Sequence, residues 1–367
     1  MSITGLQTGF RDLSPQAAFG LALAGGVVVL AADLVRLVVV GELAFDRLLS
    51  LLWNGLVDSL YIGLAAIGLS MTYSILRFAN FSHGDLLTVG AFSGWTVAYL
   101  FGGIGVAGFG SRLLLNADGG TSARELGMSV LASPLAILLG LVAAAGLTIL
   151  VALAIDRLVY KRLRRADGIT LLIASVGVAL SLRYLIAIVY TQDTRGLVAS
   201  APFWNPSWLP GGPINLHEMT LVVSALALIV GVHLLLQYTK LGKSMRAMSD
   251  NRDLALVTGI STERVITSTW MIGAGLAGVA GYLIVLDRSQ ITINLGWFLL
   301  LLVFAAVILG GIGSIYGALA GSLVIGTTIN LSLIWIPSDL NQVAAFALMI
   351  LVLIYKPEGL FEGVDTA

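Results

Sequence analysis

The sequence predicts an all-α protein that crosses a lipid bilayer about ten times, with eight to ten transmembrane helices. Of its 367 residues, 58% are hydrophobic and only 11% are charged, whereas a soluble domain is about 45–50% apolar and about 25% charged. Because so few charges cannot cover a water-facing surface, most of the outside must contact hydrocarbon. The apolar residues also gather in runs of about 20, which is the length that a helix needs to span a bilayer.

The rest of the composition narrows the function classes. The net charge is zero, which gives no indication of a nucleic-acid partner. Cys is absent and the three His residues lie far apart, so we expect no thiolate chemistry and no metal site. The 43 Gly residues favour a bundle whose helices approach closely.

Ten apolar runs are candidate spans. Their ranges are 17–40, 50–74, 84–105, 130–155, 169–190, 219–238, 265–286, 298–311, 314–333 and 341–355. The eighth and ninth come from one stretch that is too long for a single crossing, and we divide it at Gly310, Gly311 and Gly313 because Gly can break a helix. These glycines could form a hinge or only permit close packing. No repeat between the two halves is evident.

The distribution of cations sets the orientation. With the N-terminus in the cytoplasm, thirteen of the twenty Lys and Arg residues fall in inner segments and five in outer segments, as the positive-inside rule requires. The basic residues at 157–165 are expected to act as topology determinants. Ten spans place the C-terminus in the cytoplasm. The first run is expected to be a retained span, although it could be cleaved or lie along the membrane surface.

We therefore expect three regions. Residues 1–46 form an N-terminal extension with an extra apolar span, 47–358 form the transmembrane domain, and 359–367 form a C-terminal tail. The longest outer segments are 106–129 and 191–218, and the Trp residues of the second indicate either a segment on the membrane surface or an ordinary loop.

The longest inner segment, 239–264, can form short helices. Asp250 and Asn251 resemble a cap that starts a second helix, and Gly259 resembles a helix stop. An amphipathic helix here could dock into a partner's groove, or the loop could simply be solvated. The segment also contains Gly-Lys-Ser, but Gln237 stands where a phosphate-binding loop needs its first Gly. ATP-driven transport would therefore require another subunit.

Five polar residues beside or within the spans are candidates to line a translocation path. Asn80, His83 and Asp85 form a cluster before the third span, and ionisable groups at membrane depth are often functional. The alternative is structural: Asn80 and Asp85 cap the helix, and His83 bonds a carbonyl. Asn54 and Asp58 share one helix face.

Charged residues within the spans could also pair with one another. Asp58 could line the path, or it could pair with a neighbouring helix. One possible partner is Arg183, in the fifth span. In the first span, Asp33 and Arg36 are spaced to form an ion pair within one helix.

Four segments together resemble the branched-chain amino acid ABC transporter permeases, the LivH and LivM family, and LivH more closely. They are Asn54-Gly55-Leu56, the RFANFSHGD segment at 77–85, the 241–260 loop, and the Gly-rich stretch at 304–321. The resemblance implies the permease fold of an ABC importer in the bacterial inner membrane, carrying branched-chain or related amino acids. Related permeases carry urea or short amides, so the substrate stays open.

The resemblance also implies partners. A second permease (LivM-like or an identical copy) would complete the path, a periplasmic binding protein would deliver substrate, and two cytoplasmic ATPases would hold ATP and Mg²⁺. The ATPases would dock on the 239–264 loop, for which Gly242, Arg246, Asp253 and Gly259 are candidates. The chain itself would bind no cofactor and catalyse no reaction. The alternative hypotheses for the function are a stand-alone secondary transporter and an intramembrane enzyme that uses His83 and Asp85.

Overall fold

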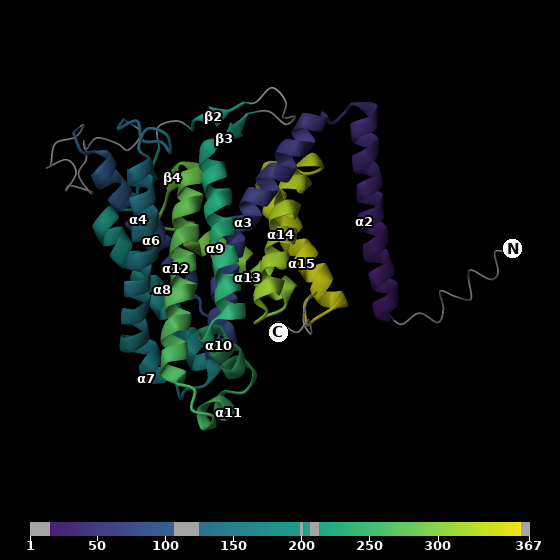
Figure 1. Ribbon diagram of the computed structural model, residues 1–367. Helices are drawn as coiled ribbons and strands as arrows, with labels where there is room; N and C mark the ends of the chain where they lie inside the picture. Colours follow the sequence, from purple (N-terminus) through teal and green to yellow (C-terminus); the bar gives the residue numbers. More distant parts are fainter. Residues whose placement is uncertain (1–14, 106–124, 199–200, 206–212, 361–367) are drawn as a thin grey trace.

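A computed structural model describes residues 15–105, 125–198, 201–205 and 213–360. Within these ranges the chain forms a bundle of long, roughly parallel helices (Figure 1). Eight of the described helices are long and apolar enough to span a membrane, which confirms an all-α polytopic membrane protein. The helices are α2 (Pro15–Val40), α3 (Phe45–Leu76), α4 (Ser82–Gly102), α6 (Pro134–Ile155), α7 (Lys161–Leu163), α8 (Gly168–Tyr190), α9 (Leu216–Tyr238), α10 (Lys240–Asp250), α11 (Arg252–Val257), α12 (Thr262–Arg288), α13 (Leu295–Gly310), α14 (Ile315–Leu331) and α15 (Asn341–Tyr355).

Each of the ten predicted spans corresponds to one helix, but two of them are unlike the others. α4 and α13 are apolar helices that are not among the eight candidate spans of the described chain. At about 1.5 Å per residue, α13 is only about 24 Å long, shorter than a hydrocarbon core of about 30 Å. It therefore cannot cross a bilayer alone.

The two ends of the bundle differ in structure (Figure 1). One end, which we call the loop end, carries α7, α10 and α11. The opposite strand end carries two short antiparallel pairs: β1 (Arg195–Gly196) with β4 (Gln290–Ile291), and β2 (Phe203–Trp204) with β3 (Ile214–Asn215). At the loop end, the predicted basic segment is bound to the start of α12, because Arg164 and Lys161 both pair with Glu263.

Helices α3 and α12 form the centre of the bundle, and most of their residues are buried. α2 stands at the edge of the bundle with most of its described side chains exposed (Figure 1). It reaches the other helices through α14 and α15: Trp335, just after α14, donates to Asp33 (2.9 Å), and Gly20 packs on Tyr355. The expected Asp33–Arg36 pair is formed at 2.9 Å. Residues 1–14 of the predicted extension lie outside the described residues, as do 106–124 and 361–367, which hold most of the predicted outer segment and tail.

The two halves of the bundle are arranged reciprocally, which the sequence did not reveal. α3 runs from the strand end to the loop end and stops at Arg77 in the left-handed conformation (φ 59°). α12 runs the opposite way and stops at Ser289, also left-handed (φ 55°). After each stop a short non-helical segment turns back into the bundle and starts a new helix, α4 in one case and α13 in the other.

The starts of α4 and α13 cross at two glycines. A Cβ on Gly84 would lie 2.7 Å from Gly296 O and 2.9 Å from Leu300 Cβ, and a Cβ on Gly296 would collide with Gly84 O and Thr88 Oγ1. These contacts are equivalent when the halves are exchanged. Two halves of opposite direction that meet in this way form an inverted-topology repeat, which many transporters contain. We call this contact the glycine crossing.

Candidate functional site

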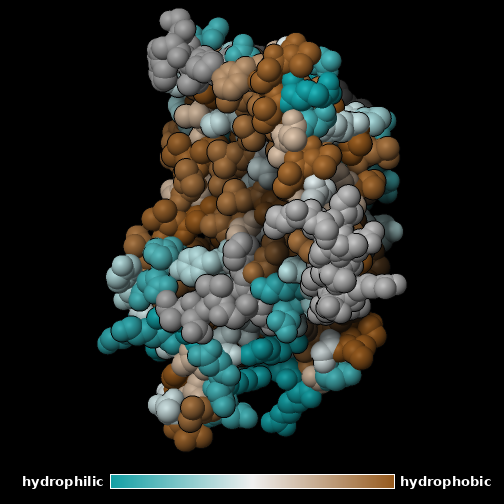
Figure 2. Space-filling view, turned by 90° about the vertical axis from the view of Figure 1, so that its right-hand side faces the viewer, coloured by the Kyte–Doolittle hydropathy of each residue, from teal (hydrophilic) through white to brown (hydrophobic). Residues whose placement is uncertain are grey.

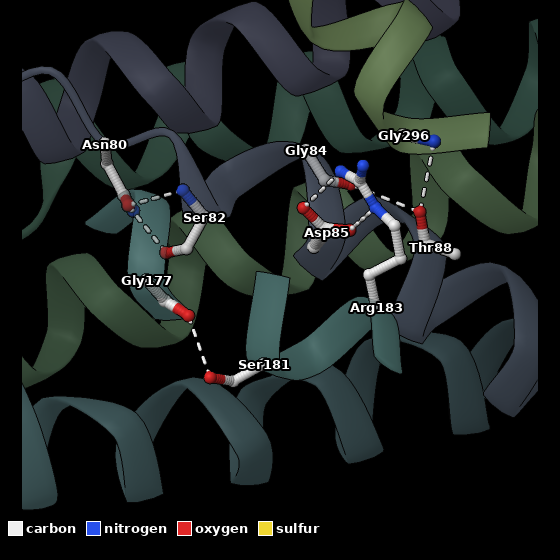
Figure 3. A network of polar contacts seen from close by, with 9 residues as sticks. All are labelled: Asn80, Ser82, Gly84, Asp85, Thr88, Gly177, Ser181, Arg183 and Gly296. Carbon is white, nitrogen blue, oxygen red and sulfur yellow. Dashed lines mark hydrogen bonds and ion pairs between the residues drawn. The ribbon is translucent and has the colours of Figure 1, made fainter. Parts of the chain in front are cut away.

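The start of α4 lies deep inside the bundle and is closed by side chains (Figure 3). Asn80 Oδ1 accepts hydrogen bonds from Ser82 N (3.1 Å), Ser82 Oγ (2.6 Å) and Tyr160 OH (3.2 Å). Phe81 N donates to Ser175 Oγ (3.0 Å). A helix start exposes N–H groups that would be costly in an apolar interior. The side chains of Asn80 and Ser175 satisfy the N–H groups of Ser82 and Phe81. The N-cap residue itself is Phe81, which makes no side-chain cap hydrogen bond, so Asn80 supports the helix start from one position before the cap.

A π-helical turn after α6 brings in one of these partners. It spans Asp156–Tyr160, and it turns the buried Tyr160 ring toward Asn80. The same ring stacks on Trp270 of α12 with centroids 5.1 Å apart. Inserted turns of this kind often occur at functional sites. This turn connects the start of α4 to the first turns of α12, which follow α11 in the chain.

Asp85 forms a bidentate ion pair with Arg183 of α8 (Figure 3). Arg183 Nε lies 3.1 Å from Asp85 Oδ1 and Nη2 lies 3.0 Å from Oδ2. The guanidinium also lies over the Trp297 ring of α13, at 4.8 Å from its centroid. The partner of Arg183 is therefore Asp85 and not Asp58, and the pair fastens α8 and α13 to α4.

His83 makes the third link from the start of α4. Its Nε2 lies 2.9 Å from the carbonyl oxygen of Ala65 in α3, which is the carbonyl contact that the structural alternative expected. Ala65 lies eleven residues before the end of α3, or about 16 Å along the helix. The segment after Arg77 thus returns far into the bundle. Asn80, His83 and Asp85 are all buried inside this single chain.

Asp58 belongs to a second polar cluster, near the strand end. Its two carboxylate oxygens accept from Tyr61 OH (2.6 Å) and Asn330 Nδ2 (2.8 Å). Arg288, the last residue of α12, donates to Tyr61 OH at 2.9 Å. Asn54, one turn before Asp58, is exposed. Arg288 is one of the five cations in the predicted outer segments, and nothing in the sequence connects it to α3.

A concavity of about 190 Å³ opens beside this cluster. Two half-buried acids, Glu218 and Asp287, lie within electrostatic reach of Asp58. The wall combines polar and apolar side chains from α12, α13 and α15. Its lining residues are Ile284, Arg288, Gln290, Thr292, Leu295, Phe298, Leu299, Leu302 and Gln342.

The segment 239–264 forms the two predicted short helices at the loop end. Thr239 Oγ1 caps α10 by accepting from Gly242 N (3.0 Å), and Asn251 Oδ1 caps α11 by accepting from Leu254 N (3.0 Å). Gly259 follows α11 with φ 85°. The predicted second cap at Asn251 and the stop at Gly259 are thus confirmed.

The four candidate coupling residues fall into two pairs. Gly242 packs so closely on Leu236 of α9 that a side chain would collide with its backbone. Arg246 Nη1 donates to the same residue's carbonyl at 2.8 Å, and thereby closes the end of α9. Asp253 and Gly259 are exposed. The first pair braces the loop, and the second lies on its surface.

α10 and α11 connect the surface of the loop end to the interior. Arg77, just before the buried segment of α4, donates a hydrogen bond to the carbonyl of Ser249 at the end of α10. Leu254, Leu256 and Val257 of α11 are 59%, 53% and 86% exposed. We call these three residues the α11 tip. Figure 2 shows apolar atoms at the lowest point of the molecule, below hydrophilic residues and an apolar band higher up.

The predicted break at Gly310–Gly313 is real and separates α13 from α14. Gly311 and Gly313 have φ angles of 101° and 92°, which side chains disfavour. Gly310 packs directly on the backbone of Gly317. These glycines therefore make a turn and a close helix contact at once.

Comparison with known proteins identifies the family. The family described as branched-chain amino acid transport system / permease component matches residues 51–353. The high-affinity branched-chain amino acid transport system permease protein LivH of Salmonella typhimurium is 29% identical over 322 residues, which cover 86% of this chain and 96% of that protein. The corresponding permease BraD of Pseudomonas aeruginosa is 27% identical, over 84% of this chain and 93% of its own length.

A more distant relative belongs to a sugar system. The galactofuranose transporter permease protein YtfT of Escherichia coli is 27% identical over 47% of this chain and 53% of its own length. No solved structure matches the chain. The family match extends from α3 into α15 and includes both polar clusters and the loop end. The chain is therefore a LivH-like member of the branched-chain amino acid transport permease family, a multi-pass membrane protein of the transport type.

Proposed function

We propose that this chain is one of two permease subunits of an ATP-driven importer in the bacterial inner membrane, and that it moves branched-chain or related amino acids. A periplasmic binding protein delivers the substrate to the strand end. Two ATPase subunits, which bind ATP and Mg²⁺, sit at the loop end. The loop end and the C-terminus are then cytoplasmic, and the second permease is LivM-like or an identical copy.

The observation that carries the proposal is the structure of the loop end. Exposed apolar side chains at an aqueous surface mark an interaction site, and the α11 tip presents three of them. Gly242 and Arg246 hold α10 rigidly against α9. Arg77 ties the far end of α10 to the segment that starts α4. A movement imposed on α10 and α11 by the ATPases therefore reaches the interior through a short connection.

We place the translocation path on the face of the transmembrane domain that carries exposed polar side chains. Asn54, Arg288 and Gln342 are exposed on helices that are otherwise apolar, and Gln290 is exposed in β4. Polar groups at such depth normally face water or protein and not lipid. A second permease chain placed against this face would enclose a polar route.

Asn80, His83 and Asp85 then have a positioning role. Each is buried, and each holds the start of α4 to a different part of the bundle. Asn80 contacts Tyr160 of the π-helical turn, His83 contacts α3, and Asp85 contacts α8. They stabilise the glycine crossing, where α4 meets α13. In this proposal the crossing is the part that moves, and the turn at Gly311 and Gly313, at the other end of α13, supplies backbone freedom.

The chief rival is a secondary transporter driven by an ion gradient. The lack of an evident repeat in the sequence argues against this rival. The inverted repeat in the structure removes that argument, because secondary transporters commonly contain such repeats. The α11 tip and its connection through Arg77 favour the ATP-driven function, because a stand-alone transporter needs no docking surface at this end.

The test is copurification followed by transport. The tagged chain is extracted from native membranes in mild detergent, its companions are identified by mass spectrometry, and the complex is reconstituted with its binding protein. Two ATPase subunits, a second permease, and leucine uptake that requires ATP are the expected results. A chain that purifies alone and accumulates leucine in response to a proton or sodium gradient would establish the rival.

A further inference from the structure

We infer that the concavity beside Arg288 is a binding site for a zwitterionic α-amino acid, with the guanidinium of Arg288 holding its carboxylate. The inference rests on the proposed function, because it names the substrate group that the path recognises.

Arg288 is placed to bind an anion. It is exposed at the end of α12 and lines the concavity. Its guanidinium donates a hydrogen bond to the Tyr61 hydroxyl at 2.9 Å, and the Tyr61 hydroxyl in turn donates to Asp58. A guanidinium has five N–H donors in a planar fork that matches a carboxylate. Among the described residues Tyr61 accepts one of these donors, so the fork keeps donors for a ligand.

The neighbouring acids favour a zwitterion over a plain anion. Asp58 and Asp287 both interact electrostatically with Arg288, and Glu218 lies close to Asp287. A free anion would be repelled by these carboxylates. None of the three carboxylates lines the concavity itself, so they act on a ligand at a distance. An α-amino acid carries both charges on one carbon, so its ammonium offsets this repulsion while its carboxylate faces Arg288.

The remaining wall suits a small aliphatic side chain. Phe298, Leu299 and Leu302 supply apolar surface, and Gln342 supplies an amide that can bond polar groups. The volume of about 190 Å³ is below the roughly 300–1,000 Å³ typical of sites for drug-sized ligands. Because the site is open at the surface of one chain, binding should be weak until a second permease covers it, which suits a path that must release its cargo.

The chain contains no Cys, so one introduced thiol can report on the site. In the reconstituted complex, Gln290→Cys places a thiol on the wall, and Arg47→Cys places a control at an exposed position outside it. Labelling by a maleimide is followed with and without millimolar leucine. We expect leucine to slow labelling at Gln290→Cys at least threefold and to leave Arg47→Cys unchanged. Leucinamide, which has no carboxylate, should not protect.

The role of Arg288 is tested in the Gln290→Cys background. Arg288→Gln should abolish protection by leucine, whereas Arg288→Lys, which keeps the charge, should retain part of it. Undiminished protection in Arg288→Gln, or equal protection by leucinamide, would overturn the inference. So would protection that depends on phosphatidylglycerol in the vesicle and not on leucine, because the guanidinium would then hold a lipid headgroup.

The same vesicles separate this inference from the proposed function. ATP-dependent leucine uptake is measured in parallel with labelling. If uptake does not depend on ATP while leucine still protects the thiol through Arg288, the importer proposal fails and the binding site stands. If uptake requires ATP and the thiol is not protected, the importer stands and the site is wrong.

Discussion

Arg77 and Ser249 join the two parts of this permease that would have to move together. The side chain of Arg77 leaves the left-handed turn after α3 and donates to the backbone carbonyl of Ser249, in the last turn of α10. The turn that Arg77 begins leads directly to the buried start of α4. A backbone carbonyl is an acceptor that no substitution at Ser249 removes, so the contact can be tested cleanly from the arginine side.

Arg77→Ala should uncouple ATP hydrolysis from transport. A hydrogen bond from a charged group contributes about 1.5–3 kcal/mol, which is roughly a tenfold effect or more on a coupled step. We expect leucine uptake by the reconstituted complex to fall about tenfold while basal ATP hydrolysis continues. Arg162→Ala removes an exposed arginine at the same end and should change neither rate. Equal loss of uptake and hydrolysis in Arg77→Ala would point to failed assembly.

Asp85→Asn should destabilise the protein strongly. It leaves Arg183, whose side chain is only 12% exposed, as a buried charge without its carboxylate, at a cost of about 3–5 kcal/mol. The double variant Asp85→Asn with Arg183→Gln should recover much of this loss. Arg36→Gln, which breaks the exposed pair with Asp33, should lower the Tm much less, because exposed ion pairs contribute little to stability. Thermal melting of the unaltered chain and these three variants in one detergent gives the comparison. A Tm for Asp85→Asn equal to that of Arg36→Gln would contradict the structural role of the pair.

Gly296→Ala should prevent the glycine crossing from forming. Its Cβ would overlap the carbonyl of Gly84, and backbone cannot move aside as a flexible side chain can. We expect a lower Tm and loss of transport. Gly177→Ala is the matched control, since nothing lies within 4 Å of its added Cβ in the middle of α8, and Ala is favoured over Gly in helices by about 1 kcal/mol. Gly177→Ala should therefore keep or slightly raise the Tm. If Gly296→Ala keeps the original Tm and transport, α4 and α13 must lie farther apart at the crossing than the structure shows.

Val257→Asp should weaken ATPase docking without unfolding the chain. Val257 is 86% exposed, so a carboxylate there stays hydrated in the isolated permease but would lose its water in an apolar groove. The yield and Tm of the chain should not change, and the amount of ATPase that copurifies should fall at least tenfold. Thr258→Asp, at the neighbouring exposed position, adds the same charge outside the α11 tip. If the ATPase copurifies with both variants in undiminished amount, it docks elsewhere on the chain.

The sequence predicted much of this fold because its main features are local. Apolar runs locate the ten helices, and Asn251 and Gly259 mark the start of α11 and the stop after it within a few residues. The contacts that hold the polar clusters are not local. Asp85 and Arg183 are 98 positions apart, and Asp58 meets Asn330 across 272 positions. No spacing rule relates such residues, which is why Asp58 was a possible partner for Arg183.

The repeat was missed for a related reason. When the segments after α3 and α12 are aligned at their left-handed stops, Arg77 to Asp85 and Ser289 to Trp297, Gly84 and Gly296 are the only identical pair. The left-handed stop is made by Arg in one half and Ser in the other, although Gly is the usual residue there. What the halves share is backbone shape and the direction of the chain, and neither is readable from residue types.

The crossing of two oppositely directed halves has an energetic consequence for transport. If the halves exchange their conformations, the access route is transferred from one side of the membrane to the other with no new type of contact required. The outward-open and inward-open forms would then be built from the same interactions and lie close in free energy. In such a molecule ATP does not have to force a strained shape. It needs only to bias a nearly balanced equilibrium, and a few kcal/mol of differential binding is enough to do so.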